Sequence, residues 1–259
     1  MTNSNTEKAG KPAQIRQVPA LTRGIKILRR LAAADQPLGV NQIARDTGLI
    51  PSTCLHILRT LVEEGLADFD EESKRYTMGI GILPLARTVI LKNGFTQVVQ
   101  PYLDELAENF GITSIGVQAT NHDQMIVLAI ARTRLPFRLQ VEIGSRFPAF
   151  ISATGRCFAA FSNLSKKELE ENFSKLVWDN PPSFEAWMQQ VEETRERGYG
   201  IDRGEYIRGI TVLSAPLFDK TGAVSHAIVS VGVSEQMENK GIELLAHQML
   251  EAAKQTAFY

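Results

Sequence analysis

Four polar side chains between residues 51 and 64 have the spacing of one helical face. At about 100° per residue, Ser52, His56 and Arg59 lie opposite an apolar stripe, and Thr53 flanks them. Hydroxyl, imidazole and guanidinium groups can hydrogen-bond to the base edges and phosphates of double-stranded DNA. The apolar stripe consists of Cys54, Ile57, Leu58, Leu61 and Val62. We therefore predict that the polar face contacts DNA; the alternative is an ordinary solvated helix surface.

The segments around this helix predict a winged helix-turn-helix over residues 19–80. A helix at 40–47 ends at Gly48, and a short glycine-containing turn of this kind sets two helices at a steep angle. Pro51 suits the first position of the next helix, which we expect to run to Glu64. Residues 66–69 and 75–78 then predict two short strands around an acidic turn, which would form the wing. Ahead of these elements, the spacing predicts a helix over 20–34 that places Leu21, Ile25, Leu28 and Ala32 on one face.

Positive charge concentrates in the same part of the chain. Residues 1–59 contain nine Lys or Arg and three Asp or Glu, a net charge of +6, which leaves −7 for the other 200 residues of a chain whose total is −1. This asymmetry favours a phosphate-binding module joined to a module with another task, although a solvated charged surface would show it too. Arg23 and Lys26 in this segment, and Lys74 and Arg75 on the return strand of the predicted wing, are candidates for phosphate contacts; the alternative is that they serve only solubility.

The sequence contains no arrangement typical of an enzyme active site. Cys157 follows Arg156, whose charge would lower the pKa of the thiol, but a nucleophile also needs a base. None of the four histidines stands in a catalytic pattern with it, and no Cys or His pair has the spacing of a zinc site. A phosphate-binding loop and a dinucleotide-binding glycine pattern are also missing. We expect no catalytic residue, no metal and no cofactor.

The two cysteines are far apart, and the sequence has neither a secretory signal nor an apolar run of about 18 residues. These features favour a cytoplasmic protein that does not contact a membrane.

The remaining segments predict a second domain of different character. Residues 1–18 are polar and predict a flexible tail, and residues 81–96 predict a linker helix. Mixed strands and helices over 97–259 predict an α+β domain around an antiparallel sheet. Within it we expect a helix at 97–110, strands at 113–119, 125–130 and 137–141, helices at 153–162, 166–176 and 184–197, a hairpin of 210–218 with 224–233, and one closing helix at 235–258.

Short motifs occur in a fixed order along both parts of the chain. The first part contains Arg23-Gly24-Ile25-Lys26-Ile27-Leu28, Thr47-Gly48-Leu49, Ser52-Thr53, Leu58-Arg59-Thr60-Leu61, Glu64-Gly65-Leu66 and Tyr76-Thr77-Met78-Gly79. The second contains Ser152-Ala153-Thr154-Gly155-Arg156, Arg197-Gly198-Tyr199, Glu205 with Gly209, and Ala215-Pro216-Leu217-Phe218-Asp219 followed by Gly222. From about Pro19 to Ala253 the chain thereby resembles the IclR family of bacterial transcriptional regulators. The resemblance implies binding of operator DNA, a homodimer or homotetramer, and a GAF-like effector-binding domain that takes a small organic acid.

The resemblance also implies which residues surround the effector. Backbone N–H groups of Ala153, Thr154 and Gly155, at a helix start, would meet the ligand carboxylate. Members that bind small oxo-acids use an Asp, a Cys and two Ser, and these positions are here Asp202, Val212, Val229 and Val231. We therefore predict a mostly apolar pocket with one anion-binding end, and a carboxylate ligand with an aromatic or apolar body rather than glyoxylate or pyruvate. The alternative is that the valines belong to an ordinary core.

A second departure from the family concerns the DNA-binding helix. Relatives usually carry Arg where His56 stands, and His lacks the bidentate fork of Arg, so the base preference does not follow from the resemblance.

Two other functions are consistent with parts of the pattern. One is an enzyme whose active site lies in residues 99–259, with the helix-turn-helix as an accessory. The other is a helix-turn-helix that contacts only proteins. The basic face favours DNA over protein contacts, and the missing nucleophile–base pattern argues against an enzyme. The sequence therefore predicts a ligand-responsive repressor or activator of a catabolic operon.

Overall fold

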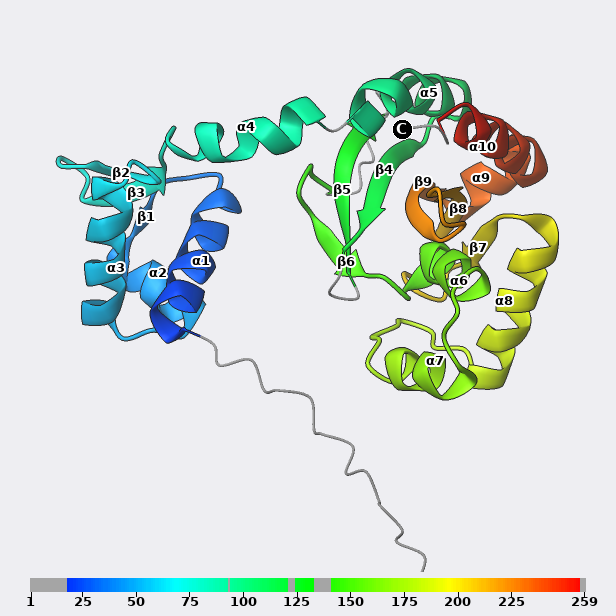
Figure 1. Ribbon diagram of the computed structural model, residues 1–259, viewed down its shortest axis with the longest axis horizontal. Coiled ribbons are helices and arrows are strands. Elements are labelled where there is room, and N and C mark those ends of the chain that lie inside the picture. The colour runs from blue at the N-terminus through cyan, green and yellow to red at the C-terminus, as the bar shows by residue number, and fades with distance from the viewer. Residues whose placement is uncertain (1–17, 93, 121–123, 133–140, 257–259) are drawn as a thin grey trace, which may run out of the picture. The chain divides into compact units, whose positions relative to one another are not determined.

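The computed structural model describes residues 18–92, 94–120, 124–132 and 141–256, and these form two compact units. The first unit ends at Lys92, and the second comprises the rest of the chain. Except for Val18, the predicted tail lies outside the described residues. Figure 1 labels the elements of both units.

The first unit is a winged helix-turn-helix, as predicted. Its elements are α1 (Pro19–Ala32), β1 (Leu38–Gly39), α2 (Val40–Thr47), α3 (Pro51–Glu63), β2 (Ala67–Asp70), β3 (Arg75–Met78) and α4 (Ile82–Lys92). Antiparallel strands in the order β1-β3-β2 form the wing sheet. Gly48 ends α2 in the left-handed region, at a φ of 71°, so that the chain turns at once into α3. Its core consists of Ile27, Leu31, Leu38, Ile43, Ala44, Cys54, Leu58, Leu61, Ala67 and Tyr76.

The apolar face predicted for α1 is not the one that is buried. Leu21 and Ile25 are 64% and 40% exposed, Ala32 is exposed and Leu28 is half-buried, whereas the buried residues of the helix are Ile27 and Leu31. The helix carries two apolar stripes, and periodicity alone cannot tell which one faces the core. The exposed stripe is therefore left without a partner among the described residues of this unit.

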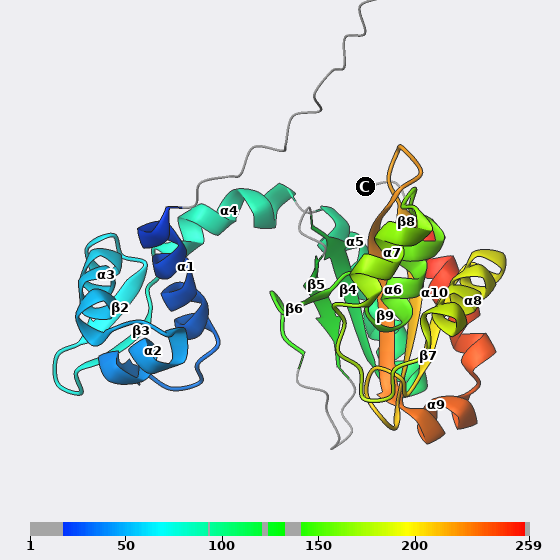
Figure 2. The same ribbon diagram turned by 90° about the horizontal axis from the view of Figure 1, so that it is seen from below.

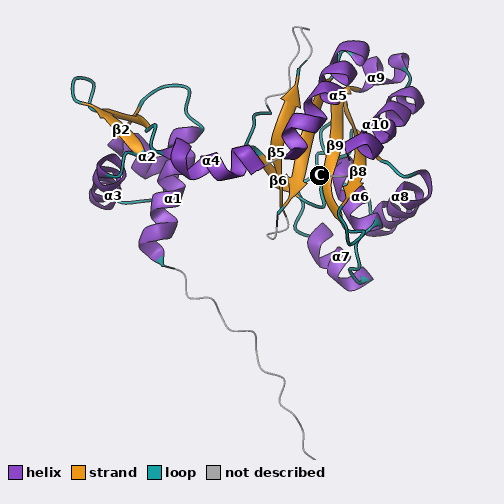
Figure 3. Ribbon diagram, turned by 45° about the horizontal axis from the view of Figure 1, so that its top comes forward, coloured by secondary structure: helices purple, strands orange, loops and turns teal. Residues whose placement is uncertain are grey.

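The second unit is an α+β domain built on one antiparallel sheet of six strands (Figure 3). The strand order is β6-β5-β4-β9-β8-β7, and every neighbouring pair is antiparallel. The strands are β4 (Thr113–Ala119), β5 (Gln124–Ala131), β6 (Arg146–Pro148), β7 (Gly200–Arg203), β8 (Ile210–Phe218) and β9 (Val224–Val233). The helices are α5 (Gly94–Phe110), α6 (Ser152–Ala160), α7 (Lys166–Phe173), α8 (Phe184–Arg197), α9 (Ser234–Lys240) and α10 (Ile242–Thr256).

The two faces of this sheet have different cores. Apolar residues of α5 and α10 pack on one face, together with Leu213 and Ile228. On the other face α6 packs mainly on β7 and β8 (Figure 2), and Val212 and Val229 belong to a separate cluster there. Because side chains alternate along a strand, β9 presents Val229 to one core and Ile228 to the other.

Several predicted elements differ from the structure. The strand predicted at 137–141 lies outside the described residues apart from Val141, which is not in a strand. The closing helix is two helices, because Gly241 takes a φ of 91° between α9 and α10. Three short strands, β1, β6 and β7, were missed because two to four residues are too few to show an alternating pattern.

Candidate functional site

The polar face of α3 points to solvent. Ser52, His56 and Arg59 are exposed and Thr53 is half-buried, whereas Cys54 and Leu58 on the opposite side are buried. Among the described residues no ion pair engages Arg59, so its guanidinium is available to an external anion. The structure thus places the four predicted side chains on one side of α3, which is the second helix of the helix-turn-helix.

The residues predicted to contact phosphate differ in whether another protein group already binds their side chains. Arg23 on α1 is exposed. Lys74 lies at the wing turn with a φ of 56°, and its ammonium is 5.8 Å from the centre of the Phe69 ring. Arg75 donates a hydrogen bond of 2.8 Å to the carbonyl of Pro37 and so ties the wing to the segment before β1. Arg75 therefore has a structural contact that the sequence did not reveal.

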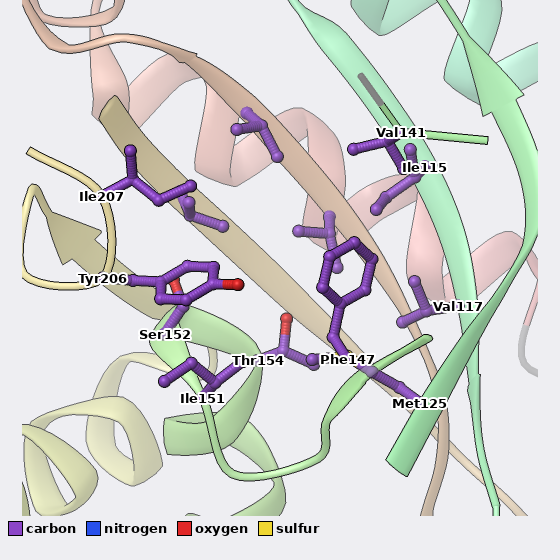
Figure 4. Close-up of a pocket in the computed structure, with 13 residues that line it drawn as sticks. Ile115, Val117, Met125, Val141, Phe147, Ile151, Ser152, Thr154, Tyr206 and Ile207 are labelled. Atoms are coloured by element: carbon purple, nitrogen blue, oxygen red, sulfur yellow. The ribbon is translucent and has the colours of Figure 1, made fainter. Parts of the chain in front are cut away.

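A cavity of about 170 Å³ lies between the sheet and the start of α6 (Figure 4). No charged side chain is among its described lining residues, and the polar ones are Ser152, Thr154 and Tyr206. Its apolar lining residues are Ile115, Val117, Met125, Val141, Phe147, Ile151, Ile207, Val212, Val229 and Val231. Figure 4 shows the hydroxyls of Thr154 and Tyr206 directed into the same end of this cavity.

The start of α6 has an unusual backbone. Ser152 takes a φ of 57°, which non-glycine residues rarely adopt, and its buried hydroxyl has no hydrogen-bond partner among the described residues. Gly155 donates its N–H to the carbonyl of Ile151 at 2.8 Å, and a Cβ on Gly155 would lie 1.9 Å from the carbonyl oxygen of Phe150. The N–H groups left without an intrahelical partner at the first turn are those of Ser152, Ala153 and Thr154. They give this end of the cavity a partial positive charge.

A buried charged cluster lies next to the cavity. The side chains of Arg156 on α6 and Asp202 on β7 are both 0% exposed, with Nη1 of Arg156 3.6 Å from Oδ2 of Asp202. Arg156 also donates to Oε1 of Gln190 at 2.9 and 2.7 Å and pairs with the carboxylate of Glu205. The guanidinium near the cavity is thus paired with two carboxylates, whereas its buried Nη1 has no hydrogen-bond partner among the described residues.

The structure brings together only part of the predicted effector set. Thr154, Val212, Val229 and Val231 line the cavity, whereas Ala153, Gly155 and Asp202 do not. Ser152 and Tyr206 line it but were missed. Ser152 directly precedes the predicted loop, and Tyr206 follows Glu205, which belongs to one of the motifs. Their positions next to these motifs, rather than their residue types, could have identified them as lining residues.

Cys157 lies on the inner side of α6 and does not have the reactive environment that its neighbour Arg156 predicted. Its thiol is buried and lies 3.2 Å from the carbonyl of Ser214. Burial raises the pKa of Cys157 to about 11 and outweighs the lowering effects of hydrogen bonds and of the arginines.

Among the described residues, no group of three or more His, Cys, Asp or Glu side chains could hold a metal ion. A search of the described helices finds no segment with the length and hydropathy needed to cross a membrane.

Comparison with known proteins gives consistent relatives for both units. The family model described as "Bacterial transcriptional regulator IclR C-terminal" matches residues 87–257, and "IclR helix-turn-helix domain" matches residues 20–71. The glycerol operon regulatory protein of Streptomyces coelicolor is 29% identical over 230 residues, which are 87% of this chain and 89% of the relative.

Two solved structures show the same fold. An IclR transcriptional regulator from Alicyclobacillus acidocaldarius superposes with a TM-score of 0.79 at 24% identity, covering 93% of this chain and 98% of the other. An IclR homologue from Microbacterium hydrocarbonoxydans, complexed with 4-hydroxybenzoate, superposes with a TM-score of 0.76 at 19% identity, covering 92% and 97%. These relatives are named as regulators or homologues of regulators, not as enzymes.

The environment of the thiols gives a chemical test. We expect neither Cys54 nor Cys157 to react with Ellman's reagent at pH 8 in the folded protein, because both are buried and burial raises the pKa of each. Both thiols should react with the reagent after guanidinium chloride has unfolded the protein. One rapidly reacting equivalent in the folded protein would show that an accessible thiolate exists and would contradict this description.

Proposed function

Because this chain belongs to the IclR family of bacterial transcriptional regulators, we propose that a small carboxylate with an apolar or aromatic body controls its binding to operator DNA. The chain is a transcriptional regulator with a helix-turn-helix and an effector domain. The proposal adds the class of effector, the pocket between α6 and the sheet as its site, and the control of a catabolic operon.

The residues that line the cavity support this class of effector. Its described lining consists of ten apolar side chains and three hydroxyl-bearing ones, next to the partly positive start of α6. A carboxylate can accept hydrogen bonds at that end, while glyoxylate or pyruvate would leave most of the apolar wall uncovered. An apolar body gains about 25 cal/mol for each Å² of apolar surface removed from water. A cavity of about 150 Å³ is known to bind benzene, so the volume here fits one ring.

The 4-hydroxybenzoate complex of a structural relative supports this choice of ligand class. That relative has the same fold, and its ligand is an aromatic carboxylate. The three valines Val212, Val229 and Val231 also favour an apolar ligand over a small polar acid.

For DNA, we propose that Ser52, Thr53, His56 and Arg59 enter the major groove, with Arg23, Lys74 and Arg75 near the phosphates. The exposed position of the α3 face supports base contacts. Phosphate contacts would carry no sequence information but would hold the helix in register.

We also propose that the protein acts as a homodimer or homotetramer. An exposed apolar stripe of α1, formed by Val18, Leu21 and Ile25, is a surface that a second copy would cover. Two copies present two recognition helices to a two-half-site operator. The effector would change their spacing through α4, the last element before the second unit, and coupling of about 1–3 kcal/mol would change DNA affinity roughly 5- to 150-fold.

The DNA interface is tested by substitutions on α3. With intergenic DNA upstream of the gene for this protein, His56→Ala and Arg59→Ala should each weaken binding by about fivefold or more in gel shifts, because each removes a hydrogen-bond donor. Glu63→Ala is the matched control, since Glu63 is exposed on the same face and its loss removes only negative charge. Unchanged affinity in both test variants, with folding intact, would remove this face from the DNA interface.

The effector class is tested by calorimetric titration of the full chain with benzoate and with glyoxylate. Benzoate should bind with a negative change in heat capacity, because apolar surface is buried, and glyoxylate should bind more weakly. Tight binding of glyoxylate together with no binding of benzoate would overturn the proposed class.

A further inference from the structure

Tyr206 contributes a polar group that the family pattern did not lead us to expect. It lies in the loop from Gly204 to Gly209 between β7 and β8, and its ring forms part of the cavity wall. Figure 4 shows its hydroxyl directed into the cavity, toward the end where Thr154 lies. No hydrogen bond from a described residue engages this hydroxyl, so it is available to a ligand.

The loop that carries Tyr206 is fixed on one side by Asp202. The carboxylate of Asp202 accepts the backbone N–H of Glu205 at 2.9 Å and that of Tyr206 at 3.3 Å. The segment after Trp178 holds the other side, because Asp179 donates its N–H to the carbonyl of Tyr206 at 3.2 Å and Asn180 donates to that of Glu205 at 2.9 Å. The backbone of Tyr206 is therefore held from both directions.

Arg156 joins this loop to the first turn of α6. Its guanidinium pairs with Asp202 and Glu205, while Gln190 bridges Arg156 and Glu205, donating to the latter at 2.8 Å. Ser152 and Thr154 lie on the same helix as Arg156, one turn or less before it. One buried cluster thus fixes the relative positions of all three hydroxyls that line the cavity.

We propose that Tyr206 selects the effector, and that Asp202 and Arg156 position Tyr206 rather than bind the ligand. This inference rests on the proposed function. The Tyr206 hydroxyl completes a single polar end that receives one carboxylate. Because the remaining described lining is apolar, a hydroxyl or second carboxylate on the body of the ligand would be buried without a partner, which is costly. The described lining therefore favours a monocarboxylate with an unsubstituted hydrocarbon body.

The ionisation of Tyr206 is consistent with this role. Burial raises the pKa of Tyr206, and the charges of Asp179 and Asp202 raise it further. The phenol consequently stays protonated at neutral pH and can donate a hydrogen bond to a carboxylate.

The test is calorimetric titration of the full chain with benzoate and 4-hydroxybenzoate. The unaltered protein should bind benzoate about tenfold or more tightly than 4-hydroxybenzoate, because burying an unpaired hydroxyl is costly and tenfold corresponds to about 1.4 kcal/mol. Tyr206→Phe keeps the ring and should weaken benzoate binding about tenfold or more, the usual loss for a hydrogen bond to a charged group. Tyr199→Phe is the matched control, since the Tyr199 hydroxyl donates to Glu243 at 3.0 Å and does not line the cavity.

Asp202→Asn tests positioning separately from general destabilisation. It should weaken benzoate binding when Tyr206 is present and have little further effect in the Tyr206→Phe background. Equal losses in both backgrounds would show that Asp202 does not act through Tyr206 and would overturn the positioning role. Thermal unfolding checks that each variant is folded, and the Tyr206→Phe comparison decides the proposal if Asp202→Asn does not fold.

The outcomes separate this inference from the proposed function. Benzoate binding that Tyr206→Phe leaves unchanged, or equal binding of benzoate and 4-hydroxybenzoate, overturns the role of Tyr206 and leaves the effector class standing. Absence of binding by both aromatic acids in the unaltered protein overturns the effector class and this inference together.

Discussion

The second unit depends on how it accommodates the buried guanidinium of Arg156. Its side chain is 0% exposed, and a buried charge is tolerated only when it is paired and hydrogen-bonded. Asp202 on β7 and Glu205 in the following loop pair with its charge, and Gln190 on α8 and Glu205 accept its hydrogen bonds, although Nη1 donates none to a described residue. Removing one partner of such a pair typically costs about 3–5 kcal/mol. The cluster therefore constrains three elements at once, and the cavity lies where those elements meet the sheet.

This constraint changes the role that the sequence indicated for the acidic group. The family pattern places an aspartate among the residues that meet small oxo-acids, whereas Asp202 here is engaged by Arg156 and by the backbone of the Tyr206 loop. The groups left to meet a ligand are neutral hydroxyls and the start of α6. A polar end with hydroxyls and the partly positive start of α6, beside an apolar wall, suits a molecule with one carboxylate and a hydrocarbon body.

The sequence predicted the architecture well where a pattern is local. The turn at Gly48, the faces of α3 and the hairpin of β8 with β9 depend on spacing and on turn residues, which a sequence displays directly. Resemblance to the family motifs, rather than a physical argument, also placed Thr154 and three valines at the cavity. The sequence could not predict the burial of Arg156, the contact of Arg75 with Pro37 or the inward hydroxyl of Tyr206, because each joins segments far apart in the chain. The exposed stripe of α1 was missed for a related reason, since two apolar stripes on one helix are equivalent until the packing is known.

Occupancy of the cavity should change the affinity of the protein for DNA. Linkage requires this coupling to be reciprocal, so ligand and DNA must change each other's affinity by the same factor. The most direct measurement is the dissociation constant for the upstream intergenic DNA, by fluorescence anisotropy, without benzoate and at a saturating benzoate concentration. We expect the DNA affinity to change by about 5- to 150-fold, matched by an equal change in benzoate affinity when DNA is bound. The same DNA affinity at both benzoate concentrations, with benzoate demonstrably bound, would contradict it.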